Sequence, residues 1–256
     1  MLNSFPDDSR ALVTGASRGI GLEFVRQLLA DGRFSRVLAG CRDPGRALDL
    51  ATLAATEPRL QLLRLDVADD QCVASAARAA REITDRLHLV VNCAGMLHDA
   101  SAGVAPEKCL ADVRPEALAT SFAVNAFGPL LVAKHFESLL ARRERAVFAS
   151  ISARVGSIGD NRLGGWYAYR GAKAAQNMFT KTLAIEWARL RRNVVCVALH
   201  PGTTDTDLSR PFQANVPPEK LFAPERTVRQ LLQVIDRLTP ADTGRFLAWD
   251  GSGIPW

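Results

Sequence analysis

The sequence contains few cysteines, and their spacing does not suit a metal. The five cysteines are odd in number, and none belongs to a CxxC pair or another spacing typical of metal ligands: Cys41, Cys72, Cys93, Cys109 and Cys196. Such cysteines are typical of small buried apolar residues in a protein kept in a reducing compartment. We therefore expect no metal site.

Signals for export and for membrane insertion are also missing. The first ten residues, MLNSFPDDSR, hold acids and a proline where a signal peptide has a basic region and then an apolar one. No window approaches 18 uninterrupted apolar residues, which is about the length that spans a bilayer. We expect a cytoplasmic protein that does not engage a membrane.

No long run of one charge is present, although the net charge is +5. The two locally basic clusters, at residues 142–145 and 189–192, fall where helices should end, and arginine there complements the helix dipole. Neither has the interleaved aromatic residues or the groove-reading motif of a nucleic-acid site. We expect no nucleic-acid partner.

The chain does have the composition of a folded enzyme-sized domain. Its 256 residues are 48% hydrophobic and 23% charged, which excludes a disordered or fibrous class. Lengths near 250 residues are common for one α/β domain, so we predict a single domain over residues 1–256.

Short apolar runs alternate with longer amphipathic stretches almost from end to end, which indicates βαβ units and a parallel sheet. The expected strands cover residues 11–14, 36–39, 60–65, 87–92, 146–151, 194–199 and 246–249. Long helices are expected at 115–141 and 167–190, and the proline-bearing segment 208–224 is expected to be a lid or substrate loop. The pattern predicts an α/β, doubly wound parallel sheet of about seven strands with helices on both faces.

A glycine-rich turn, TGASRGIG, follows the first expected strand and leads directly into an amphipathic helix. Glycine lets a backbone approach a ligand closely, and a helix N-terminus offers free N–H groups to a pyrophosphate. A glycine-rich turn without a ligand is the alternative. The candidate cofactor-binding residues here are Gly15, Ser17, Arg18, Gly19, Ile20 and Gly21.

This turn resembles the TGxxxGxG motif of the short-chain dehydrogenase/reductase family, which has a Rossmann-type fold. The resemblance covers almost the whole chain, and SARVGSIGDN, GGWYAYRGAK and WDGSGIPW resemble its C-factor-like branch. The resemblance implies that adenine lies at Asp66 and Val67, and that the cofactor also contacts Asn92, Ala94 and Gly95 of NCAG. The family has NNAG there, so Cys93 is a mild departure.

The residues after the second strand concern the choice of cofactor. NAD-dependent members of the family generally have an acid at this place, whereas this chain has Gly40, Cys41 and Arg42. Arg42 and Arg18 can pair with the 2′-phosphate of NADP(H), since guanidinium groups bind phosphate bidentately. Both can also be ordinary surface arginines, and Asp43 keeps NAD(H) possible. We favour NADP(H).

Tyr169 and Lys173 match the YxxxK motif of the same family, and a four-residue spacing puts both side chains on one helix face. A free tyrosine titrates near pH 10, and we expect the ammonium and the positive nicotinamide to lower its pKa toward the working range. The resemblance also implies that Lys173 binds the nicotinamide ribose and that Asn125, in VNAFG, anchors a water. Tyr167 lacks a lysine partner and is expected to line the pocket.

The family's catalytic serine has no direct counterpart, because Ala153 aligns with its position in SISARVG. Ser152 is the candidate substitute, although strand alternation would point it away from the substrate unless the chain bends there. Ser157 is a second substitute. A purely structural Ser152 that caps or fills the strand terminus is the alternative.

The segment after the sixth expected strand, HPGTTDT, resembles the family's PGxxxT. The resemblance implies cofactor contacts at Pro201, Gly202, Thr204 and Thr206. His200 precedes them, and a lone histidine beside a strand is more often structural than catalytic.

These observations predict an NADP(H)-dependent oxidoreductase that interconverts a small-molecule carbonyl and an alcohol, with Tyr169 as acid/base. The alternative is a cofactor-binding signalling or regulatory protein with little or no turnover, which Ala153 would explain. The family habit implies a homodimer or homotetramer that pairs through the helices at 115–141 and 167–190. We expect substrate specificity to be determined by residues 96–106 and 208–224, but their sequence does not identify a particular substrate.

Overall fold

The computed structural model describes residues 2–141, 144–190 and 193–256, so both basic clusters lie partly outside it. Seven parallel strands form the main sheet in the order β3-β2-β1-β4-β5-β6-β9. Their bounds are β1 Ser9–Thr14, β2 Phe34–Cys41, β3 Leu60–Arg64, β4 Leu89–Asn92, β5 Ala146–Ile151, β6 Val194–His200 and β9 Phe246–Ala248. The order reverses between β1 and β4, and this reversal opens a crevice at the carboxyl ends of these strands.

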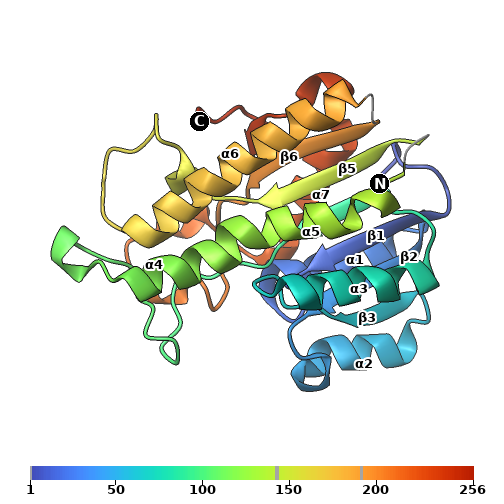
Figure 1. Cartoon of the computed structure of the whole chain (residues 1–256), viewed down its shortest axis with the longest axis horizontal. Coiled ribbons are helices and arrows are strands. Elements are labelled where there is room, and N and C mark those ends of the chain that lie inside the picture. Colours follow the sequence, from blue (N-terminus) through green and yellow to red (C-terminus); the bar gives the residue numbers. More distant parts are fainter. Residues whose placement is uncertain (1, 142–143, 191–192) are drawn as a thin grey trace.

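Helices cover both faces of the sheet (Figure 1). They are α1 Gly19–Ala30, α2 Leu48–Thr56, α3 Asp70–Ile83, α4 Pro115–Phe122, α5 Gly128–Phe136, α6 Tyr167–Arg189 and α7 Pro224–Arg237. One apolar core joins α1, α2 and α7 to the sheet, and a second joins α3, α5 and α6 to its other face. The fold prediction is confirmed, and each expected strand is present within two residues of its bounds.

The expected helix at 115–141 is divided in the structure. A π-helical turn, Ala123–Phe127, separates α4 from α5 and contains Asn125, and a 3₁₀ turn Glu137–Leu139 follows α5. π turns within helices occur often at functional sites. The helical stretch Pro115–Leu139 is long and apolar enough to cross a membrane, but it packs against α3 and α6 as part of the fold.

The expected lid segment carries only short structure. A two-stranded sheet pairs β7 Thr203–Thr204 with β8 Leu221–Phe222, and 3₁₀ turns lie at Arg210–Phe212 and Pro218–Lys220. Neither β7 nor β8 is predicted from the sequence, because two residues are too few to give a pattern.

Candidate active site

The glycine-rich turn lies at the crevice between β1 and β4. Gly15 and Gly19 have φ values of 65° and 56°. A Cβ on Gly15 would lie 2.6 Å from the nitrogen of Ala94, and one on Gly21 would lie 2.2 Å from the carbonyl oxygen of Gly15. Only glycine fits at these two places, so the chain here is packed backbone against backbone. Ser17 and Ile20 flank the start of α1 at Gly19, and the N-cap residue Arg18 makes no side-chain capping bond to the first N–H groups of the helix. Such uncapped N–H groups suit a pyrophosphate.

Several features of this crevice fit a dinucleotide. Thr206 lies beside the turn, because a Cβ on Gly19 would come within 3.3 Å of its methyl group. Asn92, at the end of β4, is 2% exposed, and its Oδ1 has no hydrogen-bond partner among the described residues. Its amide nitrogen donates to Ser150 over 3.3 Å. The glycine cradle and this unpaired oxygen mark a place for a polar ligand.

The residues after β2 offer positive charge. Arg42 is exposed directly beyond Cys41, and Arg18 is exposed with one ion pair, 3.4 Å from Asp207. The carboxylate of Asp43 accepts a hydrogen bond from the backbone nitrogen of Gly45 at 3.1 Å, which stabilises a local turn. One of the two carboxylate oxygens of Asp43 is thus used in its own local turn, and the exposed guanidinium groups of Arg18 and Arg42 offer the positive charge that a phosphate requires.

Asp66 and Val67, which the family resemblance places at the adenine, follow β3. The carboxylate of Asp66 accepts a hydrogen bond from the nitrogen of Ala68 at 3.0 Å. Val67 is buried against the start of α5, where a Cβ on Gly128 would lie 2.9 Å from the Val67 side chain. The glycine of VNAFG thus lets α5 pack closely over this end of the sheet.

Asn125 ties the π turn to the loop after β4. Its Oδ1 accepts from the nitrogen of Met96 at 3.0 Å, and its Nδ2 donates to the carbonyl of Met96 at 2.7 Å. Gly95 lies between this amide and the lysine, since a Cβ on Gly95 would be 3.4 Å from Asn125 Oδ1 and 4.0 Å from Lys173 Nζ. Asn125 therefore fixes the position of the loop that faces Lys173.

Tyr169 and Lys173 lie on the same face of α6, as their spacing predicts. The ammonium nitrogen of Lys173 is 5.8 Å from the centre of the Tyr169 ring. Burial raises the pKa of Tyr169 above its usual range and lowers the pKa of Lys173 to about 7. The protein environment alone thus favours the neutral form of both groups, which differs from the lowered tyrosine pKa expected from the sequence.

Ser152, the candidate substitute for the family's serine, is hydrogen-bonded to a neighbouring side chain in the structure. Its hydroxyl donates to Oδ1 of Asn177, on α6, at 2.7 Å, and the side chain is 2% exposed. Ser157, the second candidate, accepts a hydrogen bond from the nitrogen of Asp160 at 3.0 Å. Because the one hydroxyl proton of Ser152 is donated to Asn177, this geometry supports a structural role for Ser152 rather than a catalytic one.

The loop after β6 borders the same crevice. Gly202 has φ of 76°, and a Cβ there would lie 2.7 Å from the ring of Phe222. Pro201 and Thr204 are buried, and the hydroxyl of Thr204 is 2.9 Å from that of Thr227. Any cofactor contact of Thr204 must therefore come mainly from its backbone. His200 accepts from the nitrogen of Arg154 at 3.3 Å, which is a structural contact.

An aromatic wall stands beside Tyr169 and is not predicted from the sequence. Trp166 has ring contacts with Tyr169 at 6.4 Å and with Phe212 at 5.1 Å, and Phe212 contacts His98 at 5.9 Å. Phe212 and His98 come from the two segments expected to determine specificity. The expected substrate loop is thus connected to Tyr169 through the ring of Trp166. Tyr167 is 43% exposed, so it does not join this wall's packing.

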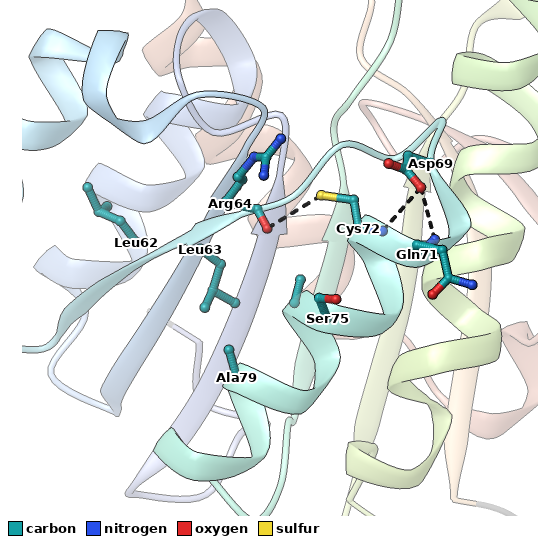
Figure 2. Close-up of a pocket in the computed structure, with 9 residues that line it drawn as sticks. Leu62, Leu63, Arg64, Asp69, Gln71, Cys72, Ser75 and Ala79 are labelled. Atoms are coloured by element: carbon teal, nitrogen blue, oxygen red, sulfur yellow. Dashed lines mark hydrogen bonds between the residues drawn. The ribbon is translucent and has the colours of Figure 1, made fainter.

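A cavity of about 470 Å³ lies elsewhere, between the edge strand β3 and α3 (Figure 2). Cys72 points from α3 toward the carbonyl of Arg64, and Asp69 caps the helix by accepting from the nitrogens of Gln71 and Cys72. None of the nine lining residues is a predicted site residue. We assign the active site to the crevice and not to this cavity.

Comparison with known proteins shows the family of the chain. Residues 9–217 match the family model described as short chain dehydrogenase. The chain belongs to this family. As a member of the short-chain dehydrogenases, it is an oxidoreductase with the sheet order and crevice described above.

The chain is similar in sequence to two relatives and in structure to one solved carbonyl reductase. The chain is 32% identical to 1-hydroxy-2-glutathionyl-2-methyl-3-butene dehydrogenase of Rhodococcus sp. strain AD45, over 97% of this chain and all of that one. It is 39% identical to C-signal of Myxococcus xanthus over 61% of this chain and 89% of that one. The NADPH-bound carbonyl reductase from chicken fatty liver superposes with a TM-score of 0.87 at 30% identity, covering 98% of this chain and 95% of that one.

Proposed function

We propose that this short-chain dehydrogenase is an NADP(H)-dependent carbonyl reductase, with Tyr169 as the proton donor and Lys173 as its partner. The observation that carries the proposal is the position of Lys173 Nζ, 5.8 Å from the Tyr169 ring, on the helix that borders the glycine-rich crevice. The structural similarity to an NADPH-bound carbonyl reductase supports both the cofactor and the reaction.

The charge around β2 supports NADP(H) over NAD(H). Arg18 and Arg42 are free to turn toward a 2′-phosphate, because both are exposed and the ion pair of Arg18 with Asp207 is long and solvated. One carboxylate oxygen of Asp43 accepts from the backbone of Gly45, which directs that oxygen into its own turn.

The residues of the chain supply binding and the proton. When bound, NADP(H) supplies a hydride from C4 of the nicotinamide, in R₂C=O + NADPH + H⁺ → R₂CHOH + NADP⁺. Tyr169 donates its phenolic proton to the carbonyl oxygen, and the ammonium of Lys173 stabilises the phenolate that remains. A bound oxidised nicotinamide would add positive charge beside Tyr169, and this charge would offset the effect of burial on the pKa of Tyr169.

A second candidate function is a cofactor-binding regulator with little turnover. The similarity to C-signal and the alanine at position 153 favour it. Such a protein would bind NADP(H) without needing a proton donor.

Consumption of NADPH, followed by absorbance across a panel of aldehydes, ketones and quinones, separates the two functions. The reductase proposal predicts turnover with at least one carbonyl and its loss in Tyr169→Phe, with cofactor binding retained. Cofactor binding without turnover on the whole panel would instead support the regulator.

A further inference from the structure

The catalytic helix buries a second polar side chain against the catalytic lysine. Gln176 is 1% exposed, although glutamine is usually a surface residue. It lies three residues after Lys173, so the two side chains share a helix face. Burying an amide destabilises the folded state unless its oxygen and nitrogen are hydrogen-bonded.

Both partners of Gln176 belong to the lysine's surroundings. Its Oε1 accepts from Lys173 Nζ at 2.8 Å, and Lys173 Nζ also donates to the carbonyl of Ile151 at 2.8 Å. The Nε2 of Gln176 donates to the same carbonyl at 3.3 Å. The lysine, the glutamine and the last carbonyl of β5 therefore form a closed triangle.

We propose that Gln176 is a positioning residue for Lys173, holding the ammonium at the end of β5, one helical turn from Tyr169. This inference rests on the proposed function, in which Lys173 is the partner of Tyr169. Without the amide, one of the two acceptors that the structure records for the ammonium is lost, and the long lysine side chain regains rotational freedom.

Neutral acceptors matter here because the lysine has no carboxylate partner within the described ranges. The titratable groups that face it are Tyr169 on the same helix and Cys93 at the end of β4. Burial raises the pKa of Cys93 far above neutrality, so its thiol stays uncharged. The positive charge of Lys173 then depends on the oxygens of Gln176 and Ile151, which favour the charged form of the group they bind.

Three variants test the assignment. Gln176→Met keeps the length of the side chain and removes the acceptor, whereas Gln176→Glu keeps an acceptor oxygen. Thr180→Val is the matched control, since Thr180 is 3% exposed on the same helix and its hydroxyl donates to the backbone carbonyl of Gln176 and not to the Gln176 amide. Circular dichroism establishes that each variant is folded.

Carbon-13 NMR of ε-labelled lysine measures the titration of Lys173 without any substrate. The chain has five lysines, and the signal of Lys173 is the one that disappears in Lys173→Met. We expect the midpoint of Lys173 to fall by roughly one unit in Gln176→Met, to rise in Gln176→Glu and to stay in place in Thr180→Val. An unchanged midpoint in folded Gln176→Met would overturn the proposal.

NADPH-dependent reduction of 4-nitrobenzaldehyde or another carbonyl turned over by the wild type provides the second readout. We expect Gln176→Met to match the wild type at about pH 5, where Lys173 is protonated in both because each midpoint lies roughly one unit or more higher, and to lose rate severalfold at pH 8. A uniform loss at both pH values would indicate a structural role and contradict the proposal. A shifted midpoint in a protein without any turnover would retain the positioning role and reject the reductase.

Discussion

The ammonium nitrogen of Lys173 lies 5.8 Å from the centre of the Tyr169 ring, and both side chains come from one face of α6. Burial shifts both groups toward neutrality, so each needs the charge of the other or of the cofactor to ionise. We predict that Lys173→Met lowers kcat for carbonyl reduction by about 10²- to 10³-fold. Steady-state kinetics measures this, with Lys181→Met as the control on the same helix. A loss under tenfold would contradict a catalytic partnership.

The exposed arginines near β2 are expected to select the cofactor. Arg42→Ala and Arg18→Ala should each raise the KM for NADPH by roughly tenfold and leave the KM for NADH unchanged, since a guanidinium–phosphate pair is worth about 1–2 kcal/mol at a solvated site. Arg46→Ala, an exposed arginine in the next turn, is the control. Equal effects on both cofactors would place the arginines outside the 2′-phosphate site.

Ser152→Ala separates a structural serine from a catalytic one. The Ser152 hydroxyl donates to Oδ1 of buried Asn177, so its removal leaves that oxygen without this donor. We expect the free energy of unfolding to fall by about 1–3 kcal/mol, with kcat nearly unchanged. Urea denaturation and turnover measure the two effects. A large fall in kcat with normal stability would restore the catalytic role suggested by the sequence alignment.

His200 should make the fold sensitive to acid. Burial lowers its pKa from 6.5 to about 4 in the folded protein, so between these pH values the unfolded chain binds a proton that the folded chain does not. The contribution of His200 to the free energy of unfolding therefore falls by roughly 2–3 kcal/mol as the pH falls from 6.5 to about 4. In His200→Asn, whose oxygen can still accept from Arg154, urea unfolding should depend less on pH in this window. An identical pH dependence would contradict the assignment.

The outer face of α6 is the proposed site of self-association. Met178 and Ile185 are 64% and 51% exposed on this helix, and Phe127 is 46% exposed on the neighbouring π turn. Large apolar side chains gathered on one face favour burial against a second copy. Size exclusion with light scattering should give a dimer or tetramer for the wild type and a monomer for Met178→Asp/Ile185→Asp. A monomeric wild type would contradict self-association through this face of α6.

The sequence predicts the sheet well because every inner strand is buried on both faces and is therefore a continuous apolar run. Val194–His200 and Ala146–Ile151 are examples, and the glycine-rich turn is equally plain because Gly15 has no room for a side chain. The π turn at Asn125 is missed, since its residues have the same apolar character as the α-helix around it.

The remaining features depend on contacts between distant segments. Gln176 is missed because one of its partners, the carbonyl of Ile151, is a backbone group that no side-chain pattern reveals. The aromatic wall joins His98, Trp166 and Phe212 from three separate loops. The direction of Ser152 depends on how the chain leaves β5, which the local sequence does not determine.

The transfer of deuterium to the product from NADPH that carries deuterium in place of both hydrogens of C4 tests the central claim most directly. With a carbonyl that the wild type reduces, mass spectrometry should find one deuterium on the carbinol carbon, and Tyr169→Phe should bind the labelled cofactor while forming almost no deuterated alcohol. An unlabelled alcohol from the wild type, or undiminished deuterated product from Tyr169→Phe, would contradict hydride transfer with Tyr169 as the proton donor.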